Sequence, residues 1–157
     1  MENSSQHDLL EETIFLELNM ARLYSLYHSI FDEDKDFWWR LTQEENNHAA
    51  LLKSARDFLE LHILPEEFLT ESMEEIKELN NLIAGKLRLF SQTPPSFKEA
   101  CELGIYVEKL SYEAHFQGIM SHASDEKIIK IFQRLNGSDK NHAERIQTLL
   151  LSRGSQT

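Results

Sequence analysis

Apolar residues recur along this chain at steps of three and four positions, the spacing that lines one face of an α-helix. One such stretch covers residues 6–31 and a second covers 36–62, with an acidic run at 32–36 between them. Leu64 and Pro65 end the second stretch, because proline cannot continue the helical hydrogen-bond ladder. The pattern predicts two antiparallel helices joined by a tight turn.

A long connection follows, and it carries a helical pattern of its own. Residues 72–90 present one apolar face, and Ser72 with Glu75 has the spacing of a capping box, in which the two residues satisfy free amides at a helix start. Some thirty residues would be unusually long for a bare loop in a compact domain. We therefore predict a helical crossover over 72–90.

The last third of the chain predicts a second helical pair, over residues 97–122 and 124–151. Ser96 and Glu99 form another capping box at the start of the first of these helices. Two antiparallel hairpins joined by one long crossover make a four-helix bundle. The expected fold is a single all-α domain.

Composition agrees with this fold and excludes several functions. The 157 residues are 41% hydrophobic and include only five Gly and three Pro, a balance that favours helices in one domain. The net charge of -11 would repel a phosphate backbone, so we expect no nucleic-acid partner. The single Cys101 excludes an internal disulfide or a thiolate metal site. No signal peptide or membrane-spanning stretch is predicted, which favours the cytoplasm.

One chemical pattern occurs twice, on helical faces that are otherwise apolar. A glutamate on one helix is followed about thirty residues later by an acidic residue three positions before a histidine. The six residues are Glu17, Glu45, His48, Glu108, Asp139 and His142. Burying unpaired carboxylates is costly, and a pair of divalent ions would offset that cost. The segments WRLTQEENNHA (39–49) and QRLNGSDKNHA (133–143) align without gaps, which indicates a duplicated hairpin.

Helix geometry favours this ligand set. Residues three apart lie side by side on a helix, so each acidic residue and its histidine can bind one ion. We choose Glu108 over Glu113, because Glu113 lies too near the following turn to stand level with Asp139. Four carboxylates balance two divalent ions. Oxygen and imidazole ligands suit iron, with manganese or zinc as alternatives.

Other polar and aromatic residues near these faces have simpler explanations. Tyr24 and Tyr112 follow Glu17 and Glu108 on their helices and are candidates for hydrogen bonds to the ligands, although helical aromatics usually fill core volume. Isolated histidines are more often buried hydrogen-bonded groups or surface residues than ligands. We therefore leave three histidines out of the site: His28, His115 and His122.

The chain resembles the ferritin-like superfamily, and within it the rubrerythrin-type di-iron domain. The motifs that carry the resemblance are FLELNMARLYSLY (15–27), QEENNHAALL (43–52), GIYVEKLSYEAHF (104–116) and FQRLNGSDKNHAERI (132–146). By this resemblance, five residues occupy ligand positions of the family: Glu17, Glu45, His48, Glu108 and His142. Asp139 stands where the family usually has glutamate, and Ser111 where rubrerythrins place a further glutamate.

The resemblance implies a di-iron protein that reacts with oxygen or hydrogen peroxide, or that oxidises ferrous iron. We expect no rubredoxin module in this chain, so an external donor would supply electrons. Pairing as a homodimer through exposed helical faces is compatible with such a bundle. Two alternatives stay open at this point: a non-catalytic iron-handling protein, and a bundle that keeps the fold for protein contacts.

Overall fold

Every regular element in the described part of the chain is a helix, which confirms the prediction of an all-α protein. The computed structural model describes residues 2–59, 66–114 and 127–154, and only the backbone of 2–6, 55–59, 66–72, 112–114 and most of 127–139. The elements are α1 (Glu2–Ile30), the 3₁₀ turn η1 (Asp32–Asp34), α2 (Lys35–Leu59), α3 (Glu66–Gln92), α4 (Phe97–Ala114) and α6 (Lys127–Gly154).

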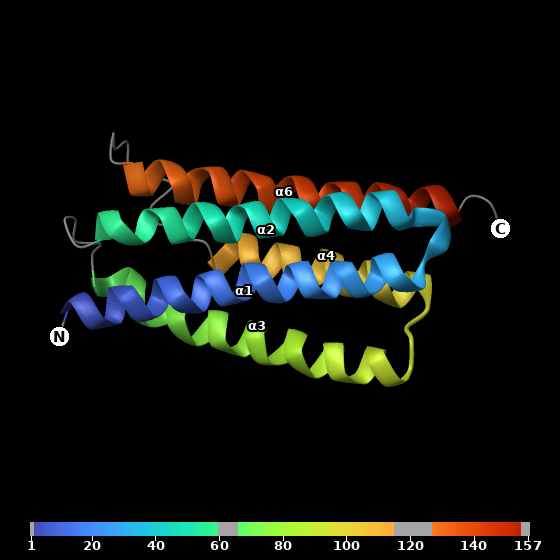
Figure 1. Cartoon of the computed structure of the whole chain (residues 1–157), viewed down its shortest axis with the longest axis horizontal. Coiled ribbons are helices and arrows are strands. Elements are labelled where there is room, and N and C mark those ends of the chain that lie inside the picture. The colour runs from blue at the N-terminus through green and yellow to red at the C-terminus, as the bar shows by residue number, and fades with distance from the viewer. Residues whose placement is uncertain (1, 60–65, 115–126, 155–157) are drawn as a thin grey trace.

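The helices form two antiparallel pairs, with α3 linking them (Figure 1). α1 packs along α2, and α4 packs along α6. α3 runs from one end of the bundle to the other along α1, so that α2 and α4 point in the same direction (Figure 1). This long return is the predicted crossover.

α1 is buried on more than one face because α3 covers the side that α2 leaves free. Leu16 and Leu23 are fully buried together with Tyr24. Between α1 and α3, Asn19 donates a hydrogen bond of 3.1 Å to the side-chain oxygen of Asn80. Because a buried polar pair must stay hydrogen-bonded, this contact sets the register of α3 on α1.

The start of α3 corrects one prediction. The helix begins at Glu66 rather than at residue 72, so Ser72 lies inside α3 and does not cap it. For the other capping box the structure shows the serine half. The Glu99 amide, in the first turn of α4, donates a hydrogen bond of 3.1 Å to the hydroxyl of Ser96, which lies just before the helix.

The remaining helix boundaries agree with the predictions to within a few residues where they can be compared. The predicted ends of the second and third long helices and the predicted start of the last one lie in 60–65 and 115–126, outside the described residues. α6 continues to Gly154 and does not end at residue 151. Arg153 holds this last turn through contacts of 2.7 Å to Glu33 and 2.5 Å to Asp34.

Gly104 lets α4 approach its neighbours closely, one turn before Glu108. A Cβ atom at this position would lie 3.1 Å from Cδ1 of Ile146 on α6 and 3.7 Å from Cε1 of Tyr24 on α1. The absence of a side chain therefore helps to bring α4 near enough for Glu108 to reach the interior.

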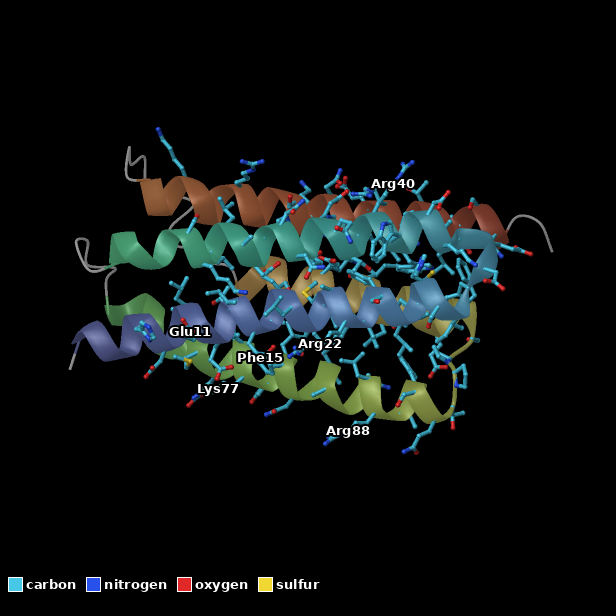
Figure 2. All side chains as sticks on the ribbon, viewed as in Figure 1. Glu11, Phe15, Arg22, Arg40, Lys77 and Arg88 are labelled. Carbon is cyan, nitrogen blue, oxygen red and sulfur yellow. The ribbon has the colours of Figure 1, made fainter. Side chains whose placement is uncertain are left out.

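Several charged side chains lie on the outside of the bundle. Figure 2 shows Arg40 on α2 and Lys77 and Arg88 on α3 pointing away from the interior, and all three are exposed. Among the described residues, no helix carries an apolar stretch long enough to cross a membrane.

Candidate metal centre

Five of the six predicted ligands meet in the interior, and they come from four helices. Their exposed fractions are 0% for Glu17, Glu45 and Glu108, 9% for His48 and 1% for His142. The sixth, Asp139, belongs to α6, but its side chain lies outside the described part of the structure. The 3.6-residue period turns each of these positions inward, and packing of the hairpins brings them together.

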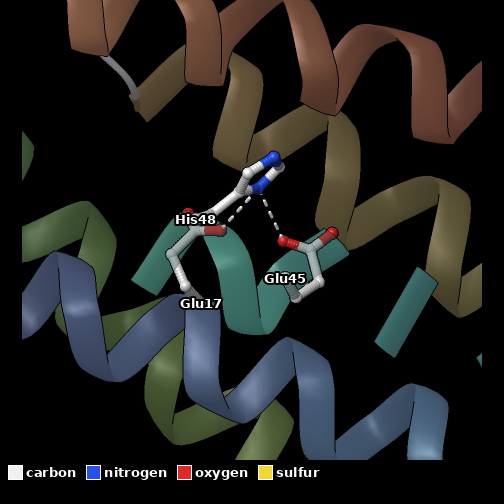
Figure 3. A group of neighbouring side chains, drawn as sticks. All are labelled: Glu17, Glu45 and His48. Atoms are coloured by element: carbon white, nitrogen blue, oxygen red, sulfur yellow. Dashed lines mark hydrogen bonds and ion pairs between the residues drawn. The ribbon is translucent and has the colours of Figure 1, made fainter. Parts of the chain in front are cut away.

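The first group consists of Glu17 on α1 with Glu45 and His48 on α2 (Figure 3). Nδ1 of His48 lies 3.2 Å from Oε2 of Glu17 and 3.1 Å from Oε2 of Glu45. One ligand atom from each residue lies within 4.8 Å of the other two. That spacing allows all three to contact a single cation.

The second group consists of Glu45 again, with Glu108 on α4 and His142 on α6. Nδ1 of His142 lies 2.6 Å from Oε1 of Glu45 and 3.3 Å from Oε1 of Glu108. Glu45 therefore belongs to both groups, with Oε2 directed to His48 and Oε1 to His142. The two imidazole rings face each other, with centroids 5.5 Å apart and planes 18° from parallel. The carboxylate of Glu45 is therefore placed where it could bridge two ions.

Several buried atoms of the second group lack a hydrogen bond within the described residues. They are Oε1 of Glu45, Oε2 of Glu108 and Nδ1 of His142. Oε1 of Glu45 and Nδ1 of His142 are 2.6 Å apart, close enough for an ion pair when the ring is protonated. Buried polar atoms are rarely left unsatisfied, so these donors fit a cation.

The charges perturb one another strongly when no ion is bound. Burial lowers the pKa of His48, but the carboxylates of Glu17 and Glu45 outweigh burial and raise that pKa to about 10. Burial also lowers the pKa of His142, but the carboxylates of Glu108 and Glu45 outweigh burial and raise that pKa to about 12. Burial and the charge of Glu45 raise the pKa of Glu108 to about 7. The metal-free site thus holds extra protons that a cation would displace.

Tyr24 contacts the site directly. Its hydroxyl donates a hydrogen bond of 2.5 Å to Oε1 of Glu108. Burial, followed by the charges of Glu108 and Glu45, raises the pKa of Tyr24 well above its ordinary value, so the phenol stays protonated. The side chains of Tyr112 and Glu113 lie outside the described residues.

Of the three histidines that we left out of the site, the structure describes His28. His28 lies at the α1–α2 turn, with Nδ1 2.9 Å from the backbone oxygen of Lys35. His115 and His122 lie outside the described residues.

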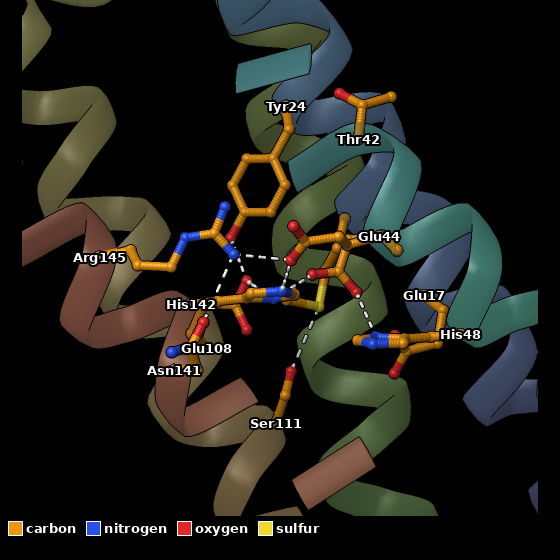
Figure 4. Close-up of polar contacts among 12 residues, drawn as sticks. Glu17, Tyr24, Thr42, Glu44, His48, Glu108, Ser111, Asn141, His142 and Arg145 are labelled. Atoms are coloured by element: carbon orange, nitrogen blue, oxygen red, sulfur yellow. Dashed lines mark hydrogen bonds and ion pairs between the residues drawn. The ribbon is translucent and has the colours of Figure 1, made fainter. Parts of the chain in front are cut away.

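Two residues that the sequence analysis did not select surround His142 (Figure 4). Oε2 of Glu44 lies 2.6 Å from Nε2 of His142 and 2.7 Å from Nη1 of Arg145. Burial opposes ionisation of Glu44, but Arg145 and His142 lower the pKa of this carboxyl. A signal was present in the sequence, because Arg145 follows His142 by three residues and therefore lies on the same side of α6.

A cavity of about 490 Å³ adjoins the site between α4 and α6. It reaches Glu108 and is otherwise lined by the following side chains: Ile105, Lys109, Lys140, Ala143, Glu144, Gln147 and Thr148. A small molecule in this cavity would be next to one carboxylate of the second group.

Comparison with known proteins gives no match for this chain among protein-family models, curated proteins or solved structures.

Proposed function

We propose that this protein is a ferritin-like, rubrerythrin-type di-iron protein that reacts with oxygen or hydrogen peroxide, or oxidises ferrous iron. The observation that carries the proposal is the position of Glu45, whose two oxygens lie 3.1 Å from Nδ1 of His48 and 2.6 Å from Nδ1 of His142. A single buried carboxylate between two histidines, with Glu17 and Glu108 completing the groups, suits a pair of ions.

The connectivity supports the ferritin-like assignment. α1 with α2 and α4 with α6 are antiparallel pairs, and α3 is the one long crossover between them. Ferritin-like bundles use this connectivity and take their ligands from side chains on facing helices. Here each of the four paired helices contributes at least one of the five clustered residues.

The donor atoms favour iron or manganese. Carboxylate oxygens and imidazole nitrogens suit these ions, whereas copper(I) and structural zinc prefer thiolates. The only cysteine, Cys101, is buried elsewhere in the core and has a pKa raised to about 12, chiefly by burial. When bound, an iron pair would supply the electrons for reduction of oxygen or peroxide.

The protein's own groups would hold and tune that pair. Glu17 and Glu108 each provide a carboxylate on one side of Glu45, and His48 and His142 each provide a nitrogen once they have released their protons. Tyr24 fixes one oxygen of Glu108 by its hydrogen bond. The cavity beside Glu108 is large enough to admit a small oxidant. Electrons for repeated turnover would come from an external donor.

A metal-free bundle with a role in protein contacts is the second candidate, and one observation favours it. With His48 and His142 protonated, the cluster of three carboxylates is already partly neutralised, since their pKa values are about 10 and about 12. Protonated histidines would therefore offset part of the buried negative charge in the absence of a metal.

Anaerobic titration with Fe(II) separates the candidates. The di-iron proposal predicts two equivalents bound per chain, followed by rapid oxidation of that iron when oxygen or peroxide is mixed in. Glu102→Gln is a matched control, because Glu102 is 58% exposed and pairs with Lys98 at the surface. This variant is expected to bind and oxidise iron like the parent.

Other stoichiometries identify the alternatives. If the chain binds no Fe(II) at micromolar concentrations, the metal-free bundle is the remaining candidate. Uptake of many irons per chain, without repeated consumption of peroxide, would indicate iron storage or handling.

A further inference from the structure

His142 is held from both sides, and the support at its Nε2 comes from outside the two ligand groups. Its Nδ1 faces Glu45 and Glu108, while its Nε2 lies 2.6 Å from Oε2 of Glu44. The same oxygen of Glu44 accepts a hydrogen bond of 2.7 Å from Arg145. Arg145 is also 3.4 Å from the side-chain oxygen of Asn141. The ring of His142 therefore has one orientation fixed by a carboxylate that is itself anchored.

Helix geometry explains how Glu44 reaches this position. Glu44 and Glu45 are consecutive on α2, so their side chains leave the helix about 100° apart. Glu45 enters the core, while Glu44 extends across the contact between α2 and α6 and remains 39% exposed. Arg145 lies three residues after His142 and so approaches Glu44 from the same face of α6.

His48 lacks the corresponding support among the described residues. Its Nδ1 faces Glu17 and Glu45, but no described carboxylate lies at its Nε2. The aligned segments 39–49 and 133–143, extended in the same register, explain the difference. Ser138 occupies the position equivalent to Glu44, and Leu51 the position equivalent to Arg145. Within the described side chains, the two halves of the chain thus surround their histidines differently.

We infer that Glu44 and Arg145 are positioning residues for His142 and make its site the tighter of two unequal metal sites. The inference rests on the proposed function. A carboxylate on the far nitrogen of a ligating histidine fixes the tautomer with Nδ1 free to bind and makes the imidazole a stronger donor. Arg145 holds Glu44 in place, so the benefit is specific to the ion bound by Glu45, Glu108 and His142.

A simpler role for the same contacts is an ion pair that ties α6 to α2. That role would affect the whole bundle, and therefore both metal sites, to a similar extent. The two roles are separated by measuring each site alone. His48→Ala leaves the His142 site for study, and His142→Ala leaves the His48 site.

The experiment is an anaerobic titration of the full chain with Co(II). Calorimetry and the visible absorption of the bound ion monitor the binding. The parent is expected to bind two equivalents in two distinguishable steps. In the His48→Ala background, Glu44→Gln is expected to raise the Kd for Co(II) by about 10- to 100-fold, the usual effect of removing such a partner. In the His142→Ala background, the same substitution should change the Kd by less than about twofold.

Two further variants keep the result interpretable. Arg145→Met removes the anchor of Glu44 and should weaken the His142 site in the same direction but by a smaller factor. Glu74→Gln removes one negative charge from the exposed surface of α3 and should leave both sites unchanged. Circular dichroism and the thermal midpoint establish that each variant is folded.

The outcomes are distinct from those that test the proposed function. Two bound ions in the parent, with Glu44→Gln altering neither single site or both equally, would overturn the positioning role alone. A parent chain that binds no Co(II) and no Fe(II) would overturn the proposed function, and this inference with it.

Discussion

Tyr24 and Glu108 share a hydrogen bond of 2.5 Å between α1 and α4. This contact joins the two hairpins at the point where the candidate metal centre lies. Glu108 is fully buried, and the Tyr24 ring stacks on Trp38 with a centroid distance of 5.7 Å. The hydroxyl is therefore held by packing, and it serves as a preset donor to one carboxylate of the site.

Replacing Tyr24 by phenylalanine should destabilise the metal-free protein more than the metal-bound one. Without a cation, loss of the hydroxyl leaves a buried carboxylate oxygen with one partner fewer, which typically costs about 1–3 kcal/mol. A bound ion would hold Glu108 in place of the phenol and reduce that cost. Urea unfolding with and without Co(II) measures both values. An equal loss in the two states would contradict a role for Glu108 as a ligand.

Replacing Glu45 should weaken the binding of both ions, whereas replacing Glu17 should weaken the binding of one. Glu45 belongs to both candidate groups, so Glu45→Gln should reduce the affinity for both ions. Glu17 belongs to the first group only, so Glu17→Gln should weaken the binding of one ion and leave the other bound. Equilibrium dialysis against Co(II) gives the number of ions per chain. Retention of two tightly bound ions by Glu45→Gln would rule out a shared ligand.

The metal-free protein should lose stability as the pH rises above neutrality. His48 and His142 have pKa values near 6.5 when unfolded and of about 10 and about 12 in the fold, so the folded state binds more protons. Their stabilising effect is complete below about pH 6.5 and declines above it, by about 1.4 kcal/mol per pH unit for each histidine. Chemical unfolding in the presence of a chelator, from pH 6 to pH 9, measures this slope.

Metal binding should show the opposite dependence on pH. The histidines must release protons before they can act as ligands, and Glu108, with a pKa of about 7, must ionise. Affinity for Co(II) should therefore increase from pH 6 to pH 8, with proton release visible in weakly buffered solution. Affinity that is independent of pH would argue against both histidines as ligands.

Arg153 should control the order of the last turn of α6. It contacts Glu33 and Asp34, and its guanidinium carbon lies 4.7 Å from the ring centre of Phe97. Arg153→Ala should lower the free energy of unfolding by about 1 kcal/mol, because these contacts are only partly buried. Hydrogen exchange should accelerate at the C-terminal end of α6 while amides near His142 keep their protection. Unchanged exchange at that end would contradict the anchoring role.

Two predicted helix boundaries differ from those in the structure. The pattern of Ser72 and Glu75 matches a capping box, but serine three residues before glutamate also occurs inside helices, where its hydroxyl caps nothing. The apolar pattern predicts an end at residue 151, yet α6 continues to Gly154, where Arg153 contacts the distant turn at Glu33 and Asp34. Local patterns do not contain such long-range contacts.

The apolar periodicity of the chain is enough to predict the helices and the inward direction of the polar residues. Periodicity is a local property of the chain, so charged positions on an apolar stripe identify Glu17, Glu45, His48, Glu108 and His142 before any packing is known. The packing of the folded chain was needed to show that Glu45 lies between the two histidines and that Glu44 reaches His142. Those relationships depend on the spacing and rotation of neighbouring helices, which are set by close packing such as that at Gly104.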